Sequence, residues 1–292
     1  MALRLKAPRQ DYLVVEPPHA AQQTSVSTAA GGTGDAERRF GGLSRLYGAD
    51  GAHNIRTAHV VLVGIGGVGS WAAEALARSG VAALTLIDLD HIAESNVNRQ
   101  IHALTSTVGQ SKVVAMRDRI VQINPACRVR CVEDFVDADN WPAIAQLDAA
   151  ASLLPSVLDA CDQVQAKTAM AAWALQSRAN FITVGAAGGK RQAHRVEIAD
   201  LAAVTHDPLL AKVRYSLRKH HNAARHGQLG LTGVFSRETV APPISSPATL
   251  ATSQSSSVDS NLSCHGYGSV VSVTATFGLC AAGWLLNKIA TH

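Results

Sequence analysis

Short runs of apolar residues alternate with longer segments of helical periodicity through the centre of the chain. The apolar runs are VVLVG (60–64), ALTLID (83–88), RVRCVEDFV (128–136), SLLPSVLDA (152–160) and NFITVG (180–185), and they predict strands. Segments with the spacing of amphipathic helices lie between them at 70–79, 112–122 and 165–179. This alternation predicts right-handed crossovers, and therefore an α/β domain with a mainly parallel sheet and helices on both faces.

The pattern loosens after residue 189. DPLLAKVRYSLRKHHNAARHG (207–227) predicts a helix with a basic end, and GLTGVFSRETV (230–240) predicts a strand. The charge-free stretch 266–287 is diluted by small and hydroxylated residues, which favours a buried core helix over a membrane span. We expect residues 1–36 to form a flexible tail and the Pro- and Ser-rich stretch 242–260 to form a mobile loop, so residues 37–292 are predicted to form a single domain.

Composition narrows the class of protein without naming a partner. Of 292 residues, 47% are hydrophobic and 16% are charged, which excludes a wholly disordered chain. A net charge of +4 permits an anionic partner but does not require one. The five cysteines are scattered, with no C-x-x-C pair, which argues against a disulfide framework or a structural zinc site and suits a reducing cytoplasm. The N-terminus lacks the apolar core of a secretion signal.

A glycine-rich turn follows the first predicted strand. Gly64, Gly66, Gly67 and Gly69 would let backbone N–H groups approach a phosphate at the start of the next helix. Asp88 ends the second strand, where a carboxylate can hold ribose hydroxyls. The pattern predicts a nucleotide site, although an NAD site would show the same features, and a glycine turn that merely packs a helix on a strand is the plainer alternative.

Donors and positive charges gather just beyond that acid. Asn96, Arg99 and Lys112 supply more positive charge than the pyrophosphate of NAD needs, and they suit a triphosphate. Each also has a structural alternative. Asn96 could be a turn residue, and Arg99 and Lys112 could belong to a solvated face. Asp162, a further candidate just after the run 152–160, could be the N-cap of a helix.

Taken in order and spacing, these motifs resemble the adenylating enzymes related to ThiF, MoeB and the ubiquitin-activating enzymes. The matching positions are Gly64-x-Gly66-Gly67-x-Gly69, Asp88-x-Asp90, Asn96-x-x-Arg99-Gln100, Lys112 and Asp159-Ala160-Cys161-Asp162. Within that superfamily the chain is most similar to the tRNA threonylcarbamoyladenosine dehydratases (TcdA, also called CsdL), in segments such as RFGGLSRLYG, NRQIHAL, VGQSKV, ITVGAAGG, DPLLAKVR and VTATFG. The similarity runs from about residue 38 to the C-terminus.

This resemblance implies a Rossmann-like, three-layer fold and a set of residue roles. The nucleotide-binding half would span about 58–189, and the half for substrate and dimer contacts about 190–292. The resemblance places the four glycines and Asn96 near the phosphates, Asp88 on the ribose, Asp90 and Asp159 beside the nucleotide or supporting a neighbour, Arg99 and Lys112 on the phosphates as catalytic groups, and Asp162 on Mg²⁺ as both catalytic and metal-binding residue. Some relatives reach an arginine across a dimer to the nucleotide, and Arg45 is the candidate for that role here.

The implied reaction is ATP-dependent activation of a carboxylate. In the dehydratase family the substrate is N6-threonylcarbamoyladenosine in tRNA, whose own carboxylate is adenylated before another atom of the same modification closes a five-membered ring. The implied cofactors are ATP and Mg²⁺. The implied partners are tRNA, a second copy of the chain and a cysteine desulfurase, with no DNA. The basic run 212–226 would grip tRNA or form a solvated face. Cys264 would be reactive or merely packed.

Two alternatives remain open at this point. A sulfur-carrier adenylyltransferase of the ThiF and MoeB type would activate the C-terminal Gly-Gly of a ubiquitin-like protein, but such relatives usually carry paired C-x-x-C zinc ligands that this sequence lacks. A non-catalytic nucleotide-binding partner of a cysteine desulfurase would not need Arg99, Lys112 and Asp162, all of which are present.

Overall fold

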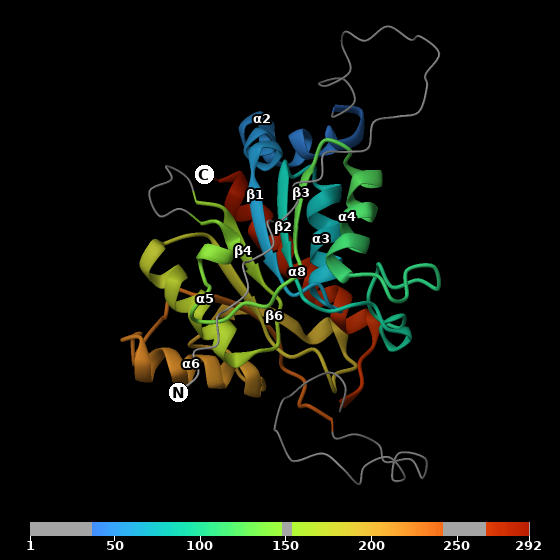
Figure 1. Ribbon diagram of the computed structural model, residues 1–292. Coiled ribbons are helices and arrows are strands. Elements are labelled where there is room, and N and C mark those ends of the chain that lie inside the picture. Colours follow the sequence, from blue (N-terminus) through green and yellow to red (C-terminus); the bar gives the residue numbers. More distant parts are fainter. Residues whose placement is uncertain (1–36, 148–153, 242–266, 292) are drawn as a thin grey trace, which may run out of the picture.

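A computed structural model describes residues 37–147, 154–241 and 267–291 and confirms the predicted α/β architecture (Figure 1). A seven-stranded sheet has the order β3-β2-β1-β4-β5-β7-β6, and every neighbouring pair is parallel except β6 with β7. The strands are β1 (His59–Val63), β2 (Ala83–Ile87), β3 (Arg128–Val132), β4 (Ser156–Asp159), β5 (Phe181–Val184), β6 (Val196–Asp200) and β7 (Thr232–Ser236).

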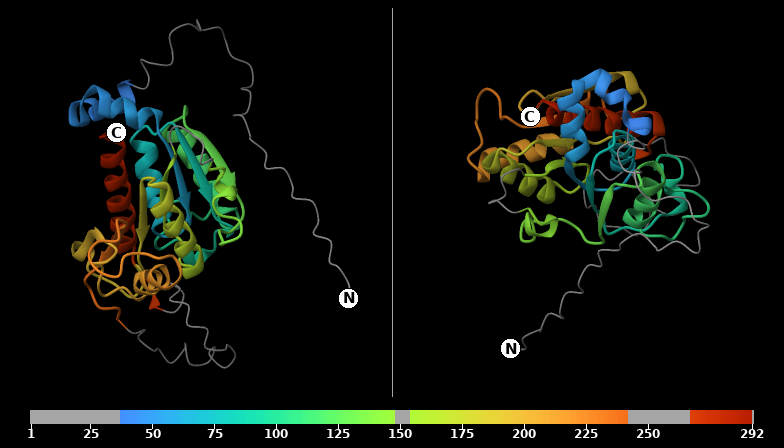
Figure 2. Two further views of the ribbon diagram at one scale, coloured as in Figure 1. Left: turned by 90° about the vertical axis from the view of Figure 1, so that its left-hand side faces the viewer. Right: turned by 90° about the horizontal axis from the view of Figure 1, so that it is seen from above.

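Helices cover both faces of this sheet and give three layers (Figure 2). One face carries α2, α3, α4 and α8, which pack on one another, and the other face carries α5 and α6. The described helices are α2 (Gly42–Thr57), α3 (Gly69–Arg78), α4 (Lys112–Ile123), α5 (Val164–Ser177), α6 (Pro208–His220) and α8 (Val271–Ala290), with short 3₁₀ turns η1 (Glu94–Asn96), η2 (Ala143–Ala145) and η3 (Ala193–Arg195).

The predicted elements of the central region are confirmed. All five apolar runs contain a strand, and the three helical segments match α3, α4 and α5. The predicted helix at 207–227 and strand at 230–240 are shorter than those ranges, as α6 and β7. The tail 1–36, the loop 242–260 and Cys264 lie outside the described residues, and the division into two halves near residue 189 stays a prediction.

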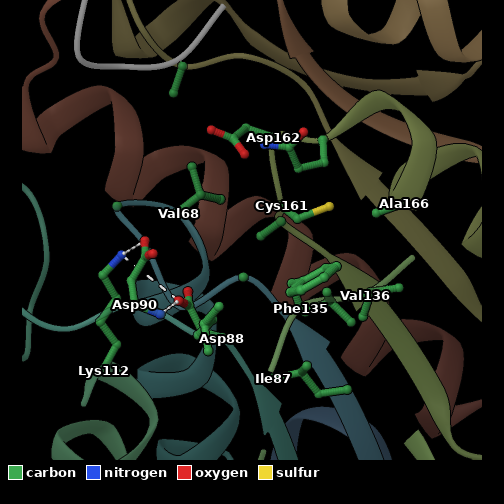
Figure 3. Close-up of a pocket in the computed structure, with 18 of the residues that line it drawn as sticks. Val68, Ile87, Asp88, Asp90, Lys112, Phe135, Val136, Cys161, Asp162 and Ala166 are labelled. Atoms are coloured by element: carbon green, nitrogen blue, oxygen red, sulfur yellow. Dashed lines mark hydrogen bonds and ion pairs between the residues drawn. The ribbon is translucent and has the colours of Figure 1, made fainter. Parts of the chain in front are cut away.

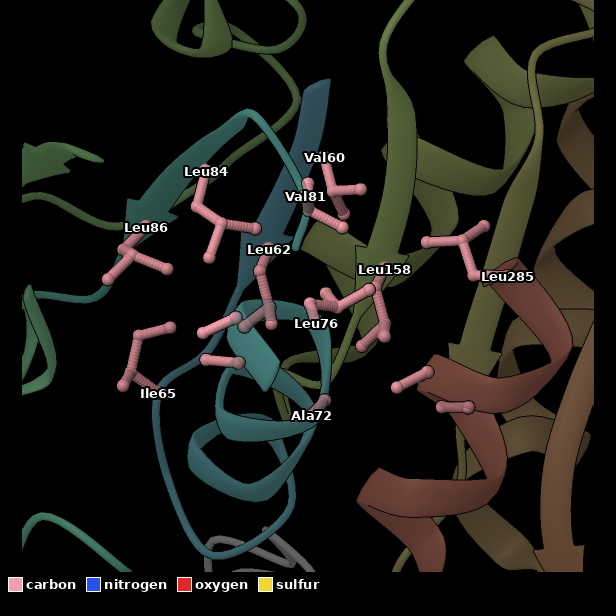
Figure 4. Packing of buried hydrophobic residues seen from close by; sticks show 14 of the residues in the cluster. Val60, Leu62, Ile65, Ala72, Leu76, Val81, Leu84, Leu86, Leu158 and Leu285 are labelled. Atoms are coloured by element: carbon pink, nitrogen blue, oxygen red, sulfur yellow. The ribbon is translucent and has the colours of Figure 1, made fainter. Parts of the chain in front are cut away.

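The larger core lies between the sheet and the helices of the α3 side (Figure 4). Leu62 of β1, Leu76 of α3 and Leu158 of β4 are all fully buried there. Burial of a side chain of this size stabilises the fold by roughly 1.5–3 kcal/mol, so this cluster holds α3 and its preceding turn firmly against β1.

Helix α8 is the one described helix long and apolar enough to cross a membrane, but it packs into this core. Val273, Phe277 and Leu285 are fully buried, and α8 makes its closest packing with α3. Gly278 allows that approach, because a Cβ atom there would collide with the carbonyl oxygen of Val68. The prediction of a core helix is therefore confirmed.

The strand order places a crevice between β1 and β4. The chain moves from β1 outward to β2 and β3, then returns to the other side of β1 as β4. The connections that follow β1 and β4 run in opposite directions along the sheet, which leaves a gap at the carboxyl ends of these two strands. Open α/β sheets bind ligands at such points.

Candidate functional site

A cavity of about 590 Å³ occupies that crevice (Figure 3). Its walls come from the turn after β1, the ends of β2 and β3, the turn after β4 and the end of β5. Among the predicted site residues it is lined by Gly64, Gly66, Gly67, Asp88, Asp90, Asn96, Arg99, Lys112 and Asp162. The fold thus brings together groups that the sequence scatters over almost one hundred residues.

The glycine turn has its shape because two of its positions have no room for a side chain. Gly64 has a φ of 87°, and a Cβ atom there would lie 2.7 Å from the backbone nitrogen of Cys161. A Cβ on Gly69 would collide with the carbonyl oxygen of Gly64. Gly66 faces open space in the cavity wall. The turn therefore packs closely against the loop after β4, and its cavity side carries no side chain at Gly66, as close approach of a phosphate requires.

Asp88 ties the end of β2 to this turn. Its Oδ2 accepts a hydrogen bond of 2.6 Å from the backbone N–H of Ile65, and its Oδ1 accepts one of 2.9 Å from that of Asp90. Burial raises the pKa of the Asp88 carboxyl, while nearby Lys112 opposes that rise. The carboxylate lies in the cavity wall, where each oxygen keeps a second lone pair for a ligand hydroxyl.

Lys112 begins α4 and is only 6% exposed, so the alternative of a solvated face is wrong. Its Nζ donates to Asp90 Oδ2 at 2.6 Å and lies 4.0 Å from Asp88 Oδ1. Asp90 itself is 71% exposed at its side chain. Asp90 therefore holds the ammonium group at the cavity edge and can release it to a phosphate with little cost, because water solvates the carboxylate left behind.

Arg99 and Asn96 come from the segment after β2. Arg99 is 9% exposed, with Nη1 donating to the carbonyl of Ser95 at 2.7 Å and its aliphatic stem against Gly67, so it too is not on a solvated face. Within the described residues no carboxylate neutralises its charge. Asn96 Oδ1 accepts a 3.1 Å hydrogen bond from the N–H of Ala93, so Asn96 shapes a turn and also lines the cavity.

Asp159 lies below the cavity rather than in its wall. It is fully buried and forms a 3.0 Å ion pair with Lys167, and Thr183 donates to it at 2.6 Å. Its Oδ1 accepts from both the N–H of Cys161 at 3.2 Å and the Cys161 thiol at 3.1 Å. Asp159 therefore supports the loop that leads to Asp162, one of the two roles that the resemblance left open for it.

Asp162 extends from that loop toward the cavity (Figure 3). Its side chain is exposed, and among the described residues it has no hydrogen-bond or ion-pair partner. The residue that caps α5 is Gln163, which makes no side-chain capping bond, so the alternative of an N-cap for Asp162 is wrong. Burial raises the pKa of the neighbouring Cys161 thiol well above its usual value, and Asp159 adds to the rise, which makes Cys161 a poor nucleophile.

Several lining residues escaped the sequence analysis. Phe135 follows β3 and stays 57% exposed beside the cavity, next to Val136. The loop after β5 contributes Ala186, which donates a 2.9 Å hydrogen bond to Asp207. Asp207 also caps α6 by accepting a 2.9 Å hydrogen bond from Leu210. The sequence places Phe135 inside the predicted strand 128–136, whereas β3 ends at Val132, so no signal in the sequence marked Phe135 as a cavity residue.

Arg45 does not belong to this cavity within one chain. It lies on α2, and α2 leads into the amino end of β1, whereas the cavity lies at the carboxyl ends of the strands (Figure 1). Any contact between Arg45 and a nucleotide would therefore have to come from another copy of the chain.

The geometry suits a negatively charged nucleotide. Lys112 and Arg99 present cationic groups to the side of the cavity reached by the glycine turn, and Asp88 lies beyond it at the end of β2. No group of three or more side chains placed to hold a metal ion occurs among the described residues. Such a site can bind phosphates, with the cations compensating the charge that develops when a phosphoanhydride bond breaks.

Comparison with known proteins supports this interpretation. The ThiF family profile matches residues 41–292. The chain is 42% identical to the tRNA threonylcarbamoyladenosine dehydratase of Escherichia coli over 255 residues, covering 86% of this chain and 93% of that protein. It is 39% identical to the Haemophilus influenzae enzyme of the same name, covering 87% and 94%. The crystal structure of E. coli TcdA in complex with ATP aligns with a TM-score of 0.73 at 39% identity, covering 87% of this chain and 95% of that one.

Proposed function

The chain belongs to the ThiF family, among the tRNA threonylcarbamoyladenosine dehydratases, and we propose that it cyclises N6-threonylcarbamoyladenosine in tRNA at the expense of ATP. The observation that carries the proposal is the buried pair of cations, Arg99 and Lys112, beside a glycine turn in a chain similar to these enzymes along most of its length. The pyrophosphate of NAD needs less positive charge than these two cations supply.

The reaction proceeds in two steps. A carboxylate oxygen of the threonyl group attacks the α-phosphorus of ATP, and pyrophosphate leaves. Another atom of the same modification then attacks the acyl carbon, which closes a five-membered ring and expels AMP carrying the attacking oxygen, so the base loses the elements of one water. Because attacker and target share one side chain, proximity supplies on the order of 7 kcal/mol or more, and no protein nucleophile is required.

The residues of the cavity have distinct roles in this proposal. The backbone of Gly66 and Gly67 approaches the phosphates, and Asp88 accepts hydrogen bonds from the ribose hydroxyls. Asn96 and Arg99 bind the phosphates, and Lys112 leaves Asp90 to offset charge on the α-phosphate and the departing pyrophosphate. These roles are supported by the position of the residues in the cavity wall. For Lys112 they are also supported by its exposed partner Asp90, which can release the ammonium group.

Asp162 is the residue proposed to hold Mg²⁺. Magnesium usually binds through one or two carboxylates together with substrate phosphates and water, and Asp162 offers one carboxylate that has no partner among the described residues and is directed into the cavity. When bound, the ion supplies positive charge that offsets the charge of the phosphates. The donor set therefore fits the ion that the resemblance implies.

Assembly and location are further parts of the proposal. We propose a homodimer, in which Arg45 reaches the nucleotide of the partner; the position of Arg45 at the far end of the sheet from its own cavity supports that arrangement. Light scattering of the purified protein tests the dimer. A cytoplasmic location fits the free thiols of the described cysteines. The cysteine desulfurase partner rests on the resemblance alone, and co-purification tests it.

Nucleoside mass spectrometry tests the proposed function. Purified protein is incubated with ATP, Mg²⁺ and tRNA that carries threonylcarbamoyladenosine, and the digested nucleosides are compared with a reaction lacking ATP. We expect an ATP-dependent product lighter by one water. Pyrophosphate exchange that depends on a ubiquitin-like protein and not on modified tRNA would instead indicate a sulfur-carrier adenylyltransferase.

A further inference from the structure

The solvent face of α6 carries a stripe of two lysines and a tyrosine. Lys212, Tyr215 and Lys219 follow one another at helical spacings of three and four, so they share one side of the helix. All three are exposed, while Leu209, Leu210, Val213 and Leu217 are buried on the opposite side. We call Lys212, Tyr215 and Lys219 the α6 stripe.

Two arginines of the basic run 212–226 form hydrogen bonds within the fold. Arg214 donates through Nη1 to the carbonyls of Leu201 and Val204, both at 2.9 Å. Arg218 donates through Nε to the carbonyl of Ala224 at 3.1 Å, which holds the turn after α6 against the helix. These two arginines therefore use part of their guanidinium groups to stabilise the local structure.

The charges of the stripe are not neutralised by the protein. No ion pair joins Lys212, Lys219 or the exposed Arg225 to a carboxylate of the described residues, and α6 itself contains no acidic residue. Local positive charge of this kind attracts a polyanion, because each phosphate contact releases condensed counterions.

Tyr215 distinguishes this surface from an ordinary solvated helix face. Its side chain is 64% exposed, and Lys219 Nζ lies 5.6 Å from the centre of its ring. An aromatic ring left in water beside lysines offers a stacking platform for an unpaired base and cations for the flanking phosphates. Unpaired bases occur in a tRNA loop, whereas duplex DNA and a lipid surface present none.

The stripe adjoins the cavity. Leu209, in the first turn of α6, lines the cavity, and Asp207 at the helix N-cap fixes the cavity loop through Ala186. At about 1.5 Å per residue, the stripe begins roughly 5 Å from Leu209 along the helix axis and ends roughly 15 Å from it. This length suits a few consecutive nucleotides next to the base that enters the cavity.

We propose that the α6 stripe docks the anticodon-loop strand of the tRNA substrate, with Tyr215 stacking on an unpaired base and Lys212 and Lys219 binding phosphates. This inference rests on the proposed function, because it assumes that the base in the cavity is part of a tRNA. According to this proposal, most of the bound tRNA lies on the side of the molecule that α6 covers.

The test measures tRNA affinity as a function of salt for three sets of variants. Lys212→Gln with Lys219→Gln removes two phosphate contacts, and we expect about 10-fold weaker binding at 0.2 M salt, about 70-fold at 0.05 M, and a log–log salt slope smaller by about 1.4. Tyr215→Ala weakens binding roughly 5- to 100-fold, and Tyr215→Phe leaves it near wild type because the ring remains.

The control removes the same two charges elsewhere. Lys288→Gln with Arg178→Gln acts at the amino ends of the strands, where Lys288 Nζ lies 5.6 Å above the Trp284 ring, so it reproduces the charge loss and the cation–aromatic pair away from the cavity. We expect wild-type tRNA affinity from this control. Thermal unfolding and ATP binding of every variant check the fold, and Arg225→Gln provides a second charge variant outside the helix.

The outcomes separate the two proposals. Unchanged tRNA affinity and salt slope for the Lys212 and Lys219 variant would overturn the docking surface, and so would equal losses in the control. Binding to phosphatidylserine vesicles is measured for the same variants. If the Lys212 and Lys219 variant lost vesicle binding but kept tRNA binding, the docking surface would also be overturned. A wild-type protein that binds tRNA through the stripe but forms no cyclic product would overturn the dehydratase proposal and leave the surface standing. In the ring-closure assay, the stripe variants should raise KM for tRNA.

Discussion

Replacing Lys167 by Met removes a buried ammonium group that three partners share. Lys167 Nζ donates to Val184 O at 2.7 Å and to Thr183 Oγ1 at 3.1 Å, and it pairs with Asp159 Oδ2 at 3.0 Å. Both charged side chains are fully buried, so water cannot take the place of the ammonium group. Removal of one member of such a pair costs about 3–5 kcal/mol, because the remaining charge is left without compensation in a medium of low polarity.

The loss should appear in both stability and ATP binding. Urea unfolding at 25 °C measures the free energy of unfolding, and we expect a decrease of about 3–5 kcal/mol for Lys167→Met. Combining it with Asp159→Asn removes the uncompensated charge and should recover part of the loss, with a coupling energy of about 1–3 kcal/mol. Because Asp159 also holds the N–H of Cys161, ATP affinity should fall with the disturbed loop beside Asp162.

An exposed lysine supplies the control for this prediction. Lys288→Met removes a charge from the surface of α8, and we expect a change within about 0.5 kcal/mol. If Lys167→Met destabilised the protein by no more than Lys288→Met does, the buried pair would not anchor the loop, and the account of Asp159 would be wrong.

Three further predictions concern the cavity and its surroundings. Lys112→Ala should lower kcat about 10²- to 10³-fold in the ring-closure assay, as loss of one electrostatic contact to a transition state does, while the protein still folds. Asp162→Ala should raise the Mg²⁺ concentration needed for half-maximal activity, whereas Lys112→Ala should not; equal Mg²⁺ curves for wild type and Asp162→Ala would exclude Asp162 as the ligand. Burial, with Lys112 and Arg119 nearby, lowers the pKa of His102 from 6.5 to about 4. As the pH falls, the unfolded chain therefore takes up the proton before the folded protein does, and this difference should lower the free energy of unfolding of wild type by about 3 kcal/mol between pH 6.5 and 4. His102→Gln should lack that part of the loss in urea titrations, and identical pH profiles would refute it.

The sequence predicted the elements with strong periodicity and missed those without it. Helix α2 has no clear apolar period, and its backbone leaves the helical conformation at Gly48, where φ is 75°. Strand β6 is a sheet-edge strand of partly exposed residues, so it lacks the apolar run that revealed β1 to β5. Both elements acquire their structure from tertiary packing, which local pattern does not encode.

The candidate site likewise contains residues that could be predicted from the sequence and contacts that could not. Asp88, Arg99 and Lys112 could be predicted because their spacing after the glycine turn is itself the signal. The pairing of Asp159 with Lys167 could not, although the two residues lie only two helical turns apart in sequence, because buried and exposed lysines look alike in a sequence. The separation of Arg214 from Lys212 on α6 likewise depends on carbonyl groups whose positions only the fold defines.

The central claim is that the threonyl carboxylate of the substrate is itself adenylated. Oxygen-18 placed in that carboxylate tests this directly, when AMP, inorganic phosphate and the cyclic nucleoside are analysed by mass spectrometry after one turnover. We predict one labelled oxygen in AMP and the other retained in the cyclic nucleoside, as the carbonyl oxygen on the acyl carbon. Label in inorganic phosphate, or AMP with no label at all, would contradict the account.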